Sequence, residues 1–337
     1  MFRLIAGLTL ALTLAGGAAA RPFVAILADP RGTVAPDVLA PYAILAESGA
    51  VEVKVVSPTR APVRLTPGHA WVAPQMTLAE AAAAQPDVII VPAMSVVEDA
   101  ARTAWLKEQA ALGARVMSIC NGAKVLAATG LLEGREATVH WFSRGRLSRA
   151  YPGVTWRDDR RWVADGPIVT TAGISAAEPA TLHLVGELAG EPVMQATAAR
   201  LGMPAPDPRH DGQAFRLTVR NMVLTVVNKL AFWRHEDVAL PLASGMDELA
   251  FGAALDGWSR TYRSTAWAVG DAAATSRHGL VLSPSAQRPQ SFDRRVSVPG
   301  ADADRATFEA IGLAYGRPTA RFVAMQFEHP YGALPRH

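Results

Sequence analysis

The sequence predicts an α/β fold in which a parallel β-sheet is covered by helices on both faces. Short strands that are apolar along their whole length alternate with longer segments of helical periodicity. Such strands have both faces buried, which is typical of parallel sheets. The chain has 337 residues, of which 50% are hydrophobic, so it can bury more than one core.

The expected elements of the first 200 residues alternate between strand and helix. Strands are expected at Phe23–Leu27, Val51–Val56, Asp87–Val91 and Arg115–Ile119, with helices at Pro36–Ser48, Ala100–Leu112 and Ala123–Leu132. Pro58–Pro74 is expected to form a loop and hairpin. After a strand pair at 161–163 and 168–171, Pro179–Leu201 is predicted to be one long amphipathic helix.

A proline-rich segment marks the predicted domain boundary. Pro204-Ala205-Pro206-Asp207-Pro208 has the composition of a linker. The chain is therefore divided into a first domain at 21–204, a linker and helix at 205–236, and a last region at 237–337. The helix of the middle segment is expected at Ala214–Trp233.

The last region repeats the outline of the first domain. Strand, helix and strand are expected at Val238–Ala243, Gly245–Trp258 and Thr265–Val269. Matching prolines lie 210 and 207 residues apart near the start of the repeat, but 126 residues apart near its end. The copy would lack about 80 central residues and would pack on the first domain to cover its edges. Chance similarity between two βαβ stretches is the alternative.

The lone cysteine of the chain lies between an expected strand and an expected helix, in Cys120-Asn121-Gly122. A residue on such a turn projects from the sheet edge, and the amides that open the next helix favour a thiolate. This layout follows the nucleophile elbow of hydrolases, with Cys in place of Ser. A buried, inert thiol is the alternative.

The residues around this turn carry a family resemblance. S-I-C-N-G-A-K-V-L-A-A-T-G-L-L-E-G-R-E-A-T-V-H-W, at 118–141, resembles the signature of the ThiJ/PfpI superfamily. This superfamily has the class I glutamine-amidotransferase-like fold, a flavodoxin-like sheet. The chain is most similar to the sensor domain of AraC-type regulators and to isonitrile hydratases, over Phe23–Met203.

The resemblance implies a set of site residues. Cys120 would be the nucleophile or redox centre, Asp37 the acidic group that reaches it, and His140 a neighbour that tunes the thiol or moves a proton. The backbone N–H groups of Asn121 and Ala93 would face an oxyanion. An Asp favoured at a helix start is an equal alternative for Asp37, as is a structural histidine beside Trp141 for His140.

The sequence also departs from the family pattern. Relatives have a Gly-Gly loop where this chain has Ala93-Met94, which puts oxyanion chemistry in doubt. Glutaminases of this fold have a His-x-Glu pair after the last strand, whereas T-T-A-G-I-S at 170–175 has no histidine. Glutamine hydrolysis is therefore not expected. The similar Q-F-E-H-P at 326–330 is predicted to end the terminal helix, away from this position.

Residues 1–20 have the pattern of a secretory signal peptide. Arg3 precedes an apolar stretch at 4–14, and Ala18-Ala19-Ala20 forms a small-residue cleavage site. The mature protein is expected to be periplasmic or secreted, without stable membrane insertion. An uncleaved anchor is the alternative. A lone cysteine in an oxidising compartment cannot form an internal disulfide, which favours a reactive role.

Two functions remain open from the sequence. The first is a cysteine-dependent hydratase or hydrolase acting on a small electrophile, and the second is a ligand-binding or redox-sensing module without catalysis. A small molecule is the expected partner in both, and a homodimer is left open. We expect no cofactor or metal, because phosphate loops, dinucleotide fingerprints and ligand-spaced clusters are missing. Scattered basic residues and predicted export argue against nucleic acid.

Overall fold

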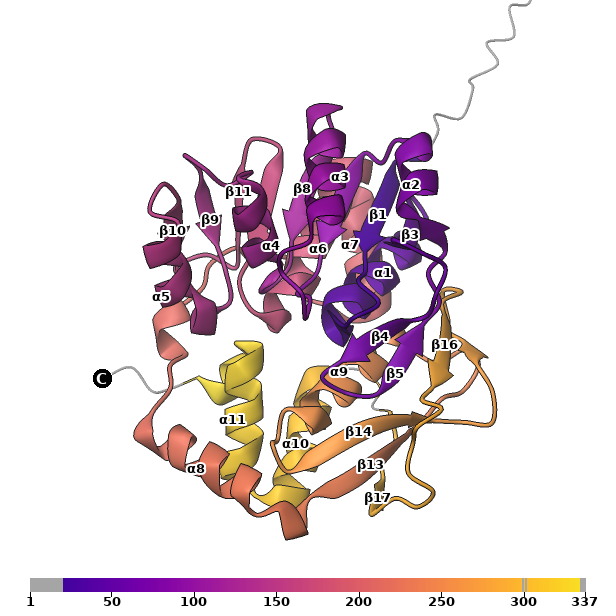
Figure 1. Cartoon of the computed structure of the whole chain (residues 1–337), viewed down its shortest axis with the longest axis vertical. Helices are drawn as coiled ribbons and strands as arrows, with labels where there is room; N and C mark the ends of the chain where they lie inside the picture. Colours follow the sequence, from indigo (N-terminus) through magenta and orange to yellow (C-terminus); the bar gives the residue numbers. More distant parts are fainter. Residues whose placement is uncertain (1–20, 299, 301, 334–337) are drawn as a thin grey trace, which may run out of the picture.

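The computed structural model describes residues 21–298, 300 and 302–333. The predicted signal peptide at 1–20 lies outside these residues. The first domain forms one end of the molecule and the last region the other, as the indigo-to-magenta and orange-to-yellow parts of the chain show (Figure 1). Among the described residues, no helix combines the length and apolar character needed to cross a membrane.

The first domain is built on a seven-stranded sheet with the order β11-β12-β8-β7-β1-β3-β6. Its strands are β1 (Phe23–Leu27), β3 (Glu52–Ser57), β6 (Met76–Thr77), β7 (Val88–Val91), β8 (Arg115–Ser118), β11 (Trp162–Asp165) and β12 (Ile168–Thr171). All neighbouring strands are parallel except β11, which runs antiparallel to β12. The predicted α/β fold with a parallel sheet is confirmed.

Helices cover both faces of this sheet. One face packs against α1 (Ala35–Ser48), α6 (Ala177–Ala189) and α7 (Glu191–Leu201), and the other against α2 (Leu78–Ala84), α3 (Ala100–Ala111) and α4 (Gly122–Thr129). Along β1, Val24 and Ile26 point into the first core, whereas Ala25 and Leu27 point into the second. A small strand pair, β9 (Glu136–Thr138) and β10 (Thr155–Arg157), flanks the sheet beside α5 (Trp141–Ala150).

Two helix predictions were wrong in extent. The expected helix at Pro179–Leu201 is two helices, because Gly190 adopts φ 89° and ψ 158° and α7 then starts at Glu191, with Pro192 in its first turn. The expected helix at Ala214–Trp233 is limited to α8 (Val219–Leu230), which begins where the Thr218 hydroxyl accepts the Asn221 N–H. Short 3₁₀ turns lie on either side of α8.

The last region has a three-stranded parallel sheet with the order β14-β13-β17. It comprises β13 (Glu236–Pro241), α9 (Glu248–Ser259), β14 (Ser264–Val269), β17 (Arg294–Arg295), α10 (Ala303–Tyr315) and α11 (Arg317–Phe327). The order corresponds to β3-β1-β7 of the first domain, and α10 and α11 follow it as α6 and α7 follow the larger sheet. A shortened copy of the first domain would have this arrangement.

The two regions share a sheet and a core. The hairpin of β4 (Val63–Thr66) and β5 (Ala70–Val72) joins β2 (Thr33–Val34), β15 (Ala274–Thr275) and β16 (Val281–Pro284) in the order β15-β16-β5-β4-β2. Strands β5 and β16 are antiparallel, with Val72 opposite Leu282. Helix α9 packs along α1, where Gly252 lies against Leu39. The linker therefore separates two stretches of sequence that fold around common apolar residues.

Candidate functional site

Cys120 lies on a sharp turn between β8 and α4. Its φ is 54°, a left-handed value that is unusual for a side chain other than Gly, and its N–H donates to the Thr171 hydroxyl at 3.2 Å. Gly122 starts α4 so close to β7 that an added Cβ would lie 2.0 Å from the Val91 carbonyl oxygen. The sharp turn predicted from the sequence is present, and a glycine is required behind it.

The Cys120 thiol is enclosed, since the residue is only 3% exposed. Burial raises its pKa well above the ordinary value, and the neighbouring Asp37 carboxyl raises it further. Arg260 and the Asn121 N–H oppose this shift without reversing it. The expectation that helix amides favour the thiolate is therefore wrong for this state of the protein. The sulfur is a neutral thiol at neutral pH.

Asp37 lies in the first turn of α1 and is fully buried near Cys120. Its Oδ2 accepts the Ala93 N–H at 3.0 Å, while its Oδ1 has no hydrogen-bond partner. Burial raises the pKa of Asp37 to about 8, with the Ala93 N–H and Arg260 opposing the shift. A neutral carboxylic acid therefore lies next to a neutral thiol.

The two predicted oxyanion donors differ in their surroundings. The Asn121 N–H lies close enough to the Cys120 thiol to lower its pKa, in opposition to the effect of burial. The Ala93 N–H already donates to Asp37. Ala93 thus orients the carboxyl group in this structure, and the second donor position is occupied.

His140 is buried at the start of α5, with both ring nitrogens hydrogen-bonded. Its Nε2–H donates to the Gln326 carbonyl at 2.8 Å, and its Nδ1 accepts the Phe142 N–H at 3.3 Å. Burial lowers the pKa of His140. The ring is therefore neutral, and its hydrogen bond to Gln326 holds α11 against the first domain. Neither ring nitrogen is free to receive the thiol proton.

Glu328, at the end of α11, is a site residue that the sequence interpretation set aside. Its Oε1 accepts the Trp141 N–H and its Oε2 contacts His210 Nε2, both at 2.6 Å. Burial opposes its ionisation, but His210, His140 and Trp141 outweigh that effect and lower the pKa of Glu328. Q-F-E-H-P does end the terminal helix as predicted, yet that helix end packs against the first domain.

The approach of Glu328 requires a glycine after the last strand. A Cβ on Gly173 would lie 2.6 Å from Glu328 Cγ, and the Ser175 hydroxyl donates to the Glu328 carbonyl at 2.8 Å. The segment that lacks the His-x-Glu pair of glutaminases therefore receives a carboxylate from the far end of the chain. Figure 1 shows α11, in yellow, below the first domain.

The last region contributes a second charged pair. Asp256 on α9 and Arg260 just after that helix form a bidentate ion pair, in which the Asp256 side chain is fully buried. The Arg260 guanidinium lowers the pKa of both Asp37 and Cys120, which places its positive charge near them. Neither residue was predicted, because both lie far along the chain.

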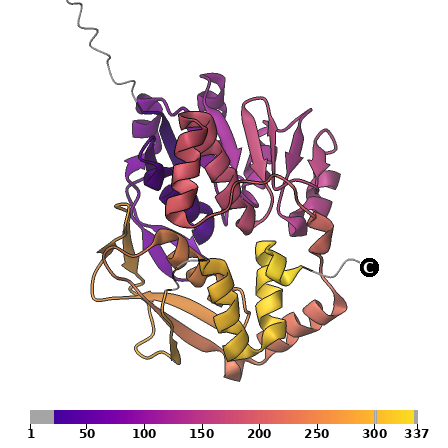
Figure 2. The ribbon, with the colours of Figure 1, turned by 180° about the vertical axis from the view of Figure 1, so that it is seen from behind.

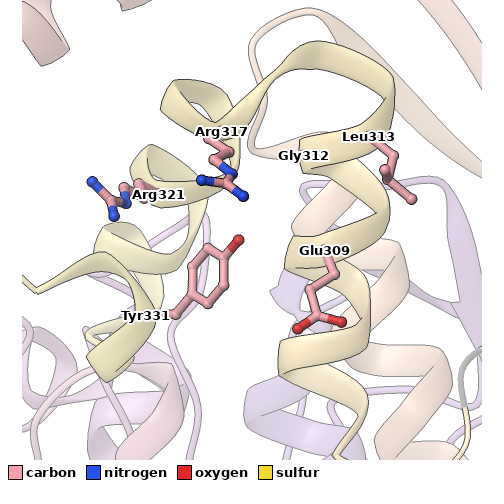
Figure 3. A pocket seen from close by; sticks show the side chains of 6 residues that line it. All are labelled: Glu309, Gly312, Leu313, Arg317, Arg321 and Tyr331. Atoms are coloured by element: carbon pink, nitrogen blue, oxygen red, sulfur yellow. The ribbon is translucent and has the colours of Figure 1, made fainter.

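One groove lies outside this cluster. It has a volume of about 600 Å³ and is lined by residues of α10 and α11, among them Arg317 and Arg321, and by Tyr331 (Figure 3). None of the predicted site residues lines this groove. The described residues hold no group of three or more His, Cys, Asp or Glu side chains arranged to bind a metal.

Comparison with known proteins decides the family. The DJ-1/PfpI family profile matches residues 24–187. Isonitrile hydratase of Pseudomonas putida is 33% identical over 179 residues, which cover 52% of this chain and 75% of the hydratase. The chain belongs to the DJ-1/PfpI family. The ThiJ/PfpI resemblance around Cys120 is thereby confirmed.

Some of the other proteins that this chain resembles are transcription regulators. The HTH-type regulator CdhR of Pseudomonas aeruginosa is 29% identical over 116 residues, about a third of either chain (34%). Among solved structures, Drosophila melanogaster DJ-1beta superposes with a TM-score of 0.50 and 22% identity, covering 55% of this chain and 99% of its own. That similarity supports the fold of the first domain. The family match ends at residue 187, before α10 and α11.

Proposed function

We propose that this DJ-1/PfpI protein is an exported, cysteine-dependent hydratase or hydrolase for a small electrophile of the isonitrile type. The observation that carries the proposal is the buried Asp37 carboxyl beside Cys120, with a pKa of about 8 and an unpartnered Oδ1. A carboxyl group that keeps its proton at neutral pH is a general acid. The similarity to an isonitrile hydratase supports the substrate class.

The proposed reaction uses both neutral groups in turn. Asp37 gives its proton to the terminal carbon of the isonitrile, and Cys120 Sγ then adds to that carbon. The Asp37 carboxylate takes the thiol proton, which leaves a covalent thioimidate. Water adds to the same carbon, and breaking of the C–S bond returns the thiol and releases a formamide. In this proposal the Asn121 N–H would stabilise charge at the reacting centre.

A non-catalytic ligand-binding or redox-sensing module is the second candidate. The enclosure of Cys120 favours this second candidate, because the residue is 3% exposed and the end of α11 is hydrogen-bonded to the first domain. Catalysis would require the last region to move aside for each substrate molecule. A sensor would need only a rare opening.

Turnover of an alkyl isonitrile, followed by NMR of the formamide product, tests the proposal. Cys120→Ser and Asp37→Asn are each expected to lower the rate at least 100-fold, since general acid catalysis contributes about 10²–10⁴. Asp247→Asn is the matched control, because Asp247 also starts a helix and has no thiol beside it. Absence of turnover, together with thermal stabilisation by small ligands, would favour the binding module instead.

A further inference from the structure

Helix α8 turns its apolar face to solvent. Its exposed apolar residues follow helical spacing and are between 48% and 72% exposed: Val219, Met222, Val223, Val226, Val227 and Leu230. Phe232 and Trp233 extend this surface just beyond the helix and are 73% and 72% exposed. The helix runs along the outer edge of the molecule in both views (Figures 1 and 2).

The opposite face of α8 is largely polar and packs against the protein. Asn228 Nδ2 donates to the Thr261 carbonyl at 2.9 Å, and Asn221 Nδ2 lies 3.1 Å from Met325 Sδ. Leu224 adds an apolar contact near Phe322. An ordinary surface helix has the reverse orientation, with its apolar stripe towards the core. A contiguous exposed apolar face of this kind marks an interaction surface.

The charged side chains of this stretch of sequence have one sign. Residues 212–235 include Arg216, Arg220, Lys229 and Arg234 but no Asp or Glu. At 100° per residue, Arg220 and Lys229 fall on opposite borders of the apolar stripe. An apolar face bordered by cations, with exposed aromatic rings at one end, is typical of helices that lie in the surface of an anionic bilayer.

We propose that α8 docks this protein on an anionic lipid surface, with Phe232 and Trp233 inserted at the headgroup level. A second copy of the chain fits this face less well. If the α8 faces of two copies met, the cations that border one apolar stripe would lie near those of the other, and no carboxylate is available within 212–235 to pair with them. The helix has 12 residues and is about 18 Å long, so its one apolar face is too small to bury the ~800 Å² per partner of a stable interface.

Vesicle co-sedimentation tests the proposal, using vesicles of 30% phosphatidylglycerol and 70% phosphatidylcholine beside vesicles of pure phosphatidylcholine. The full chain and a chain that begins at Arg21 are both used, since the apolar stretch at 4–14 would itself bind lipid. We expect the wild type to bind anionic vesicles at least tenfold more tightly than neutral ones. The double variant Val223→Asn/Val227→Asn should lose at least tenfold in affinity. Arg220→Gln/Arg234→Gln should reduce the dependence on salt.

Leu313→Asn is the control, because Leu313 is 91% exposed on α10, outside this face. All these positions are exposed, so thermal unfolding should remain that of the wild type. Equal affinity for both vesicle types, or binding unaffected by the valine variant, would overturn the proposal. So would a dimer in light scattering that the valine variant converts to a monomer, since the face would then bind a second copy.

Discussion

The two halves of this molecule use the same strand order for different purposes. In the first domain, β3-β1-β7 belong to a wide sheet that continues to β8 and presents Cys120. In the last region, β14-β13-β17 stop there, and no strand among the described residues continues that sheet. We propose that the last region is a shortened copy whose elbow portion is missing. On this proposal, the last region covers the site that it no longer contains.

Corresponding elements of the two halves meet each other. Strand β5 pairs with β16, and Val72 lies opposite Leu282, the residue 210 positions later in the proposed repeat. Helix α1 packs along α9, its counterpart. The halves are thus arranged about an approximate two-fold axis. This arrangement explains how Arg260 and Glu328, from the second half of the chain, lie near Cys120 of the first.

The helix-start aspartates give the sharpest contrast between the halves. Asp37 is fully buried, accepts the Ala93 N–H and has a pKa of about 8, whereas Asp247 caps α9 and pairs with Arg277 at 3.2 Å. The folded protein holds the Asp37 proton between about pH 4 and pH 8, but the unfolded chain releases it. Stability therefore falls as pH rises through this range and then levels off.

The largest expected effect follows from this difference. Asn cannot ionise, so the stability of Asp37→Asn relative to the wild type should increase by about 4 kcal/mol between pH 5 and pH 8. Urea denaturation across that range measures it. The matched Asp247→Asn variant should follow the wild type, because Asn also caps helices and the ion pair is partly exposed. Parallel curves for Asp37→Asn and wild type would show that Asp37 is ionised in the folded protein.

A second comparison concerns two glutamates of the last region. Glu328→Ala leaves the part-buried Trp141 N–H and His210 without their buried acceptor, which should cost about 3 kcal/mol. Glu309 is exposed on α10, so Glu309→Ala should change stability by less than about 0.5 kcal/mol. If α11 covers the site, Glu328→Ala should also speed alkylation of Cys120 by iodoacetamide. Unchanged alkylation would mean that access to the thiol does not depend on this helix end.

The local features of the site could be predicted from the sequence. Strand and helix periodicity placed β8 and α4, and the residues between them identified the Cys120 turn. Asp37 was expected in the first turn of α1, where it lies. These features depend on short stretches of chain, for which local patterns are informative.

The environment of the site could not be predicted in the same way. The charges of Glu328 and Arg260 come near Cys120 only through the packing of α9 and α11. Burial of the thiol itself reverses the expected direction of its pKa. A local signal was available for the break at Gly190, since Gly followed by Glu-Pro typically ends one helix and starts another. The apolar stripe of α8 would have suggested burial, which only the tertiary structure contradicts.

The smallest expected effect tests whether the halves have equivalent turns. Gly190, between α6 and α7, and Gly316, between α10 and α11, both have φ 89°, with ψ 158° and 153°. An added Cβ would meet only the ring of the proline two residues later, at 3.8 Å and 3.6 Å. Each Gly→Ala change should therefore cost only the backbone strain, about 1–3 kcal/mol, and the two costs should agree within about 0.5 kcal/mol.

Gly145→Ala is the control for this pair, because Gly145 lies within α5 with open space around its Cα and should stabilise the protein slightly. Urea denaturation of the three variants measures these changes. Equal costs at Gly190 and Gly316 would mean that the same strained turn joins both helix pairs, as expected if one was copied from the other. A cost at Gly190 alone would mean that the second turn relaxes, and the likeness of the halves would then be limited to their strand order.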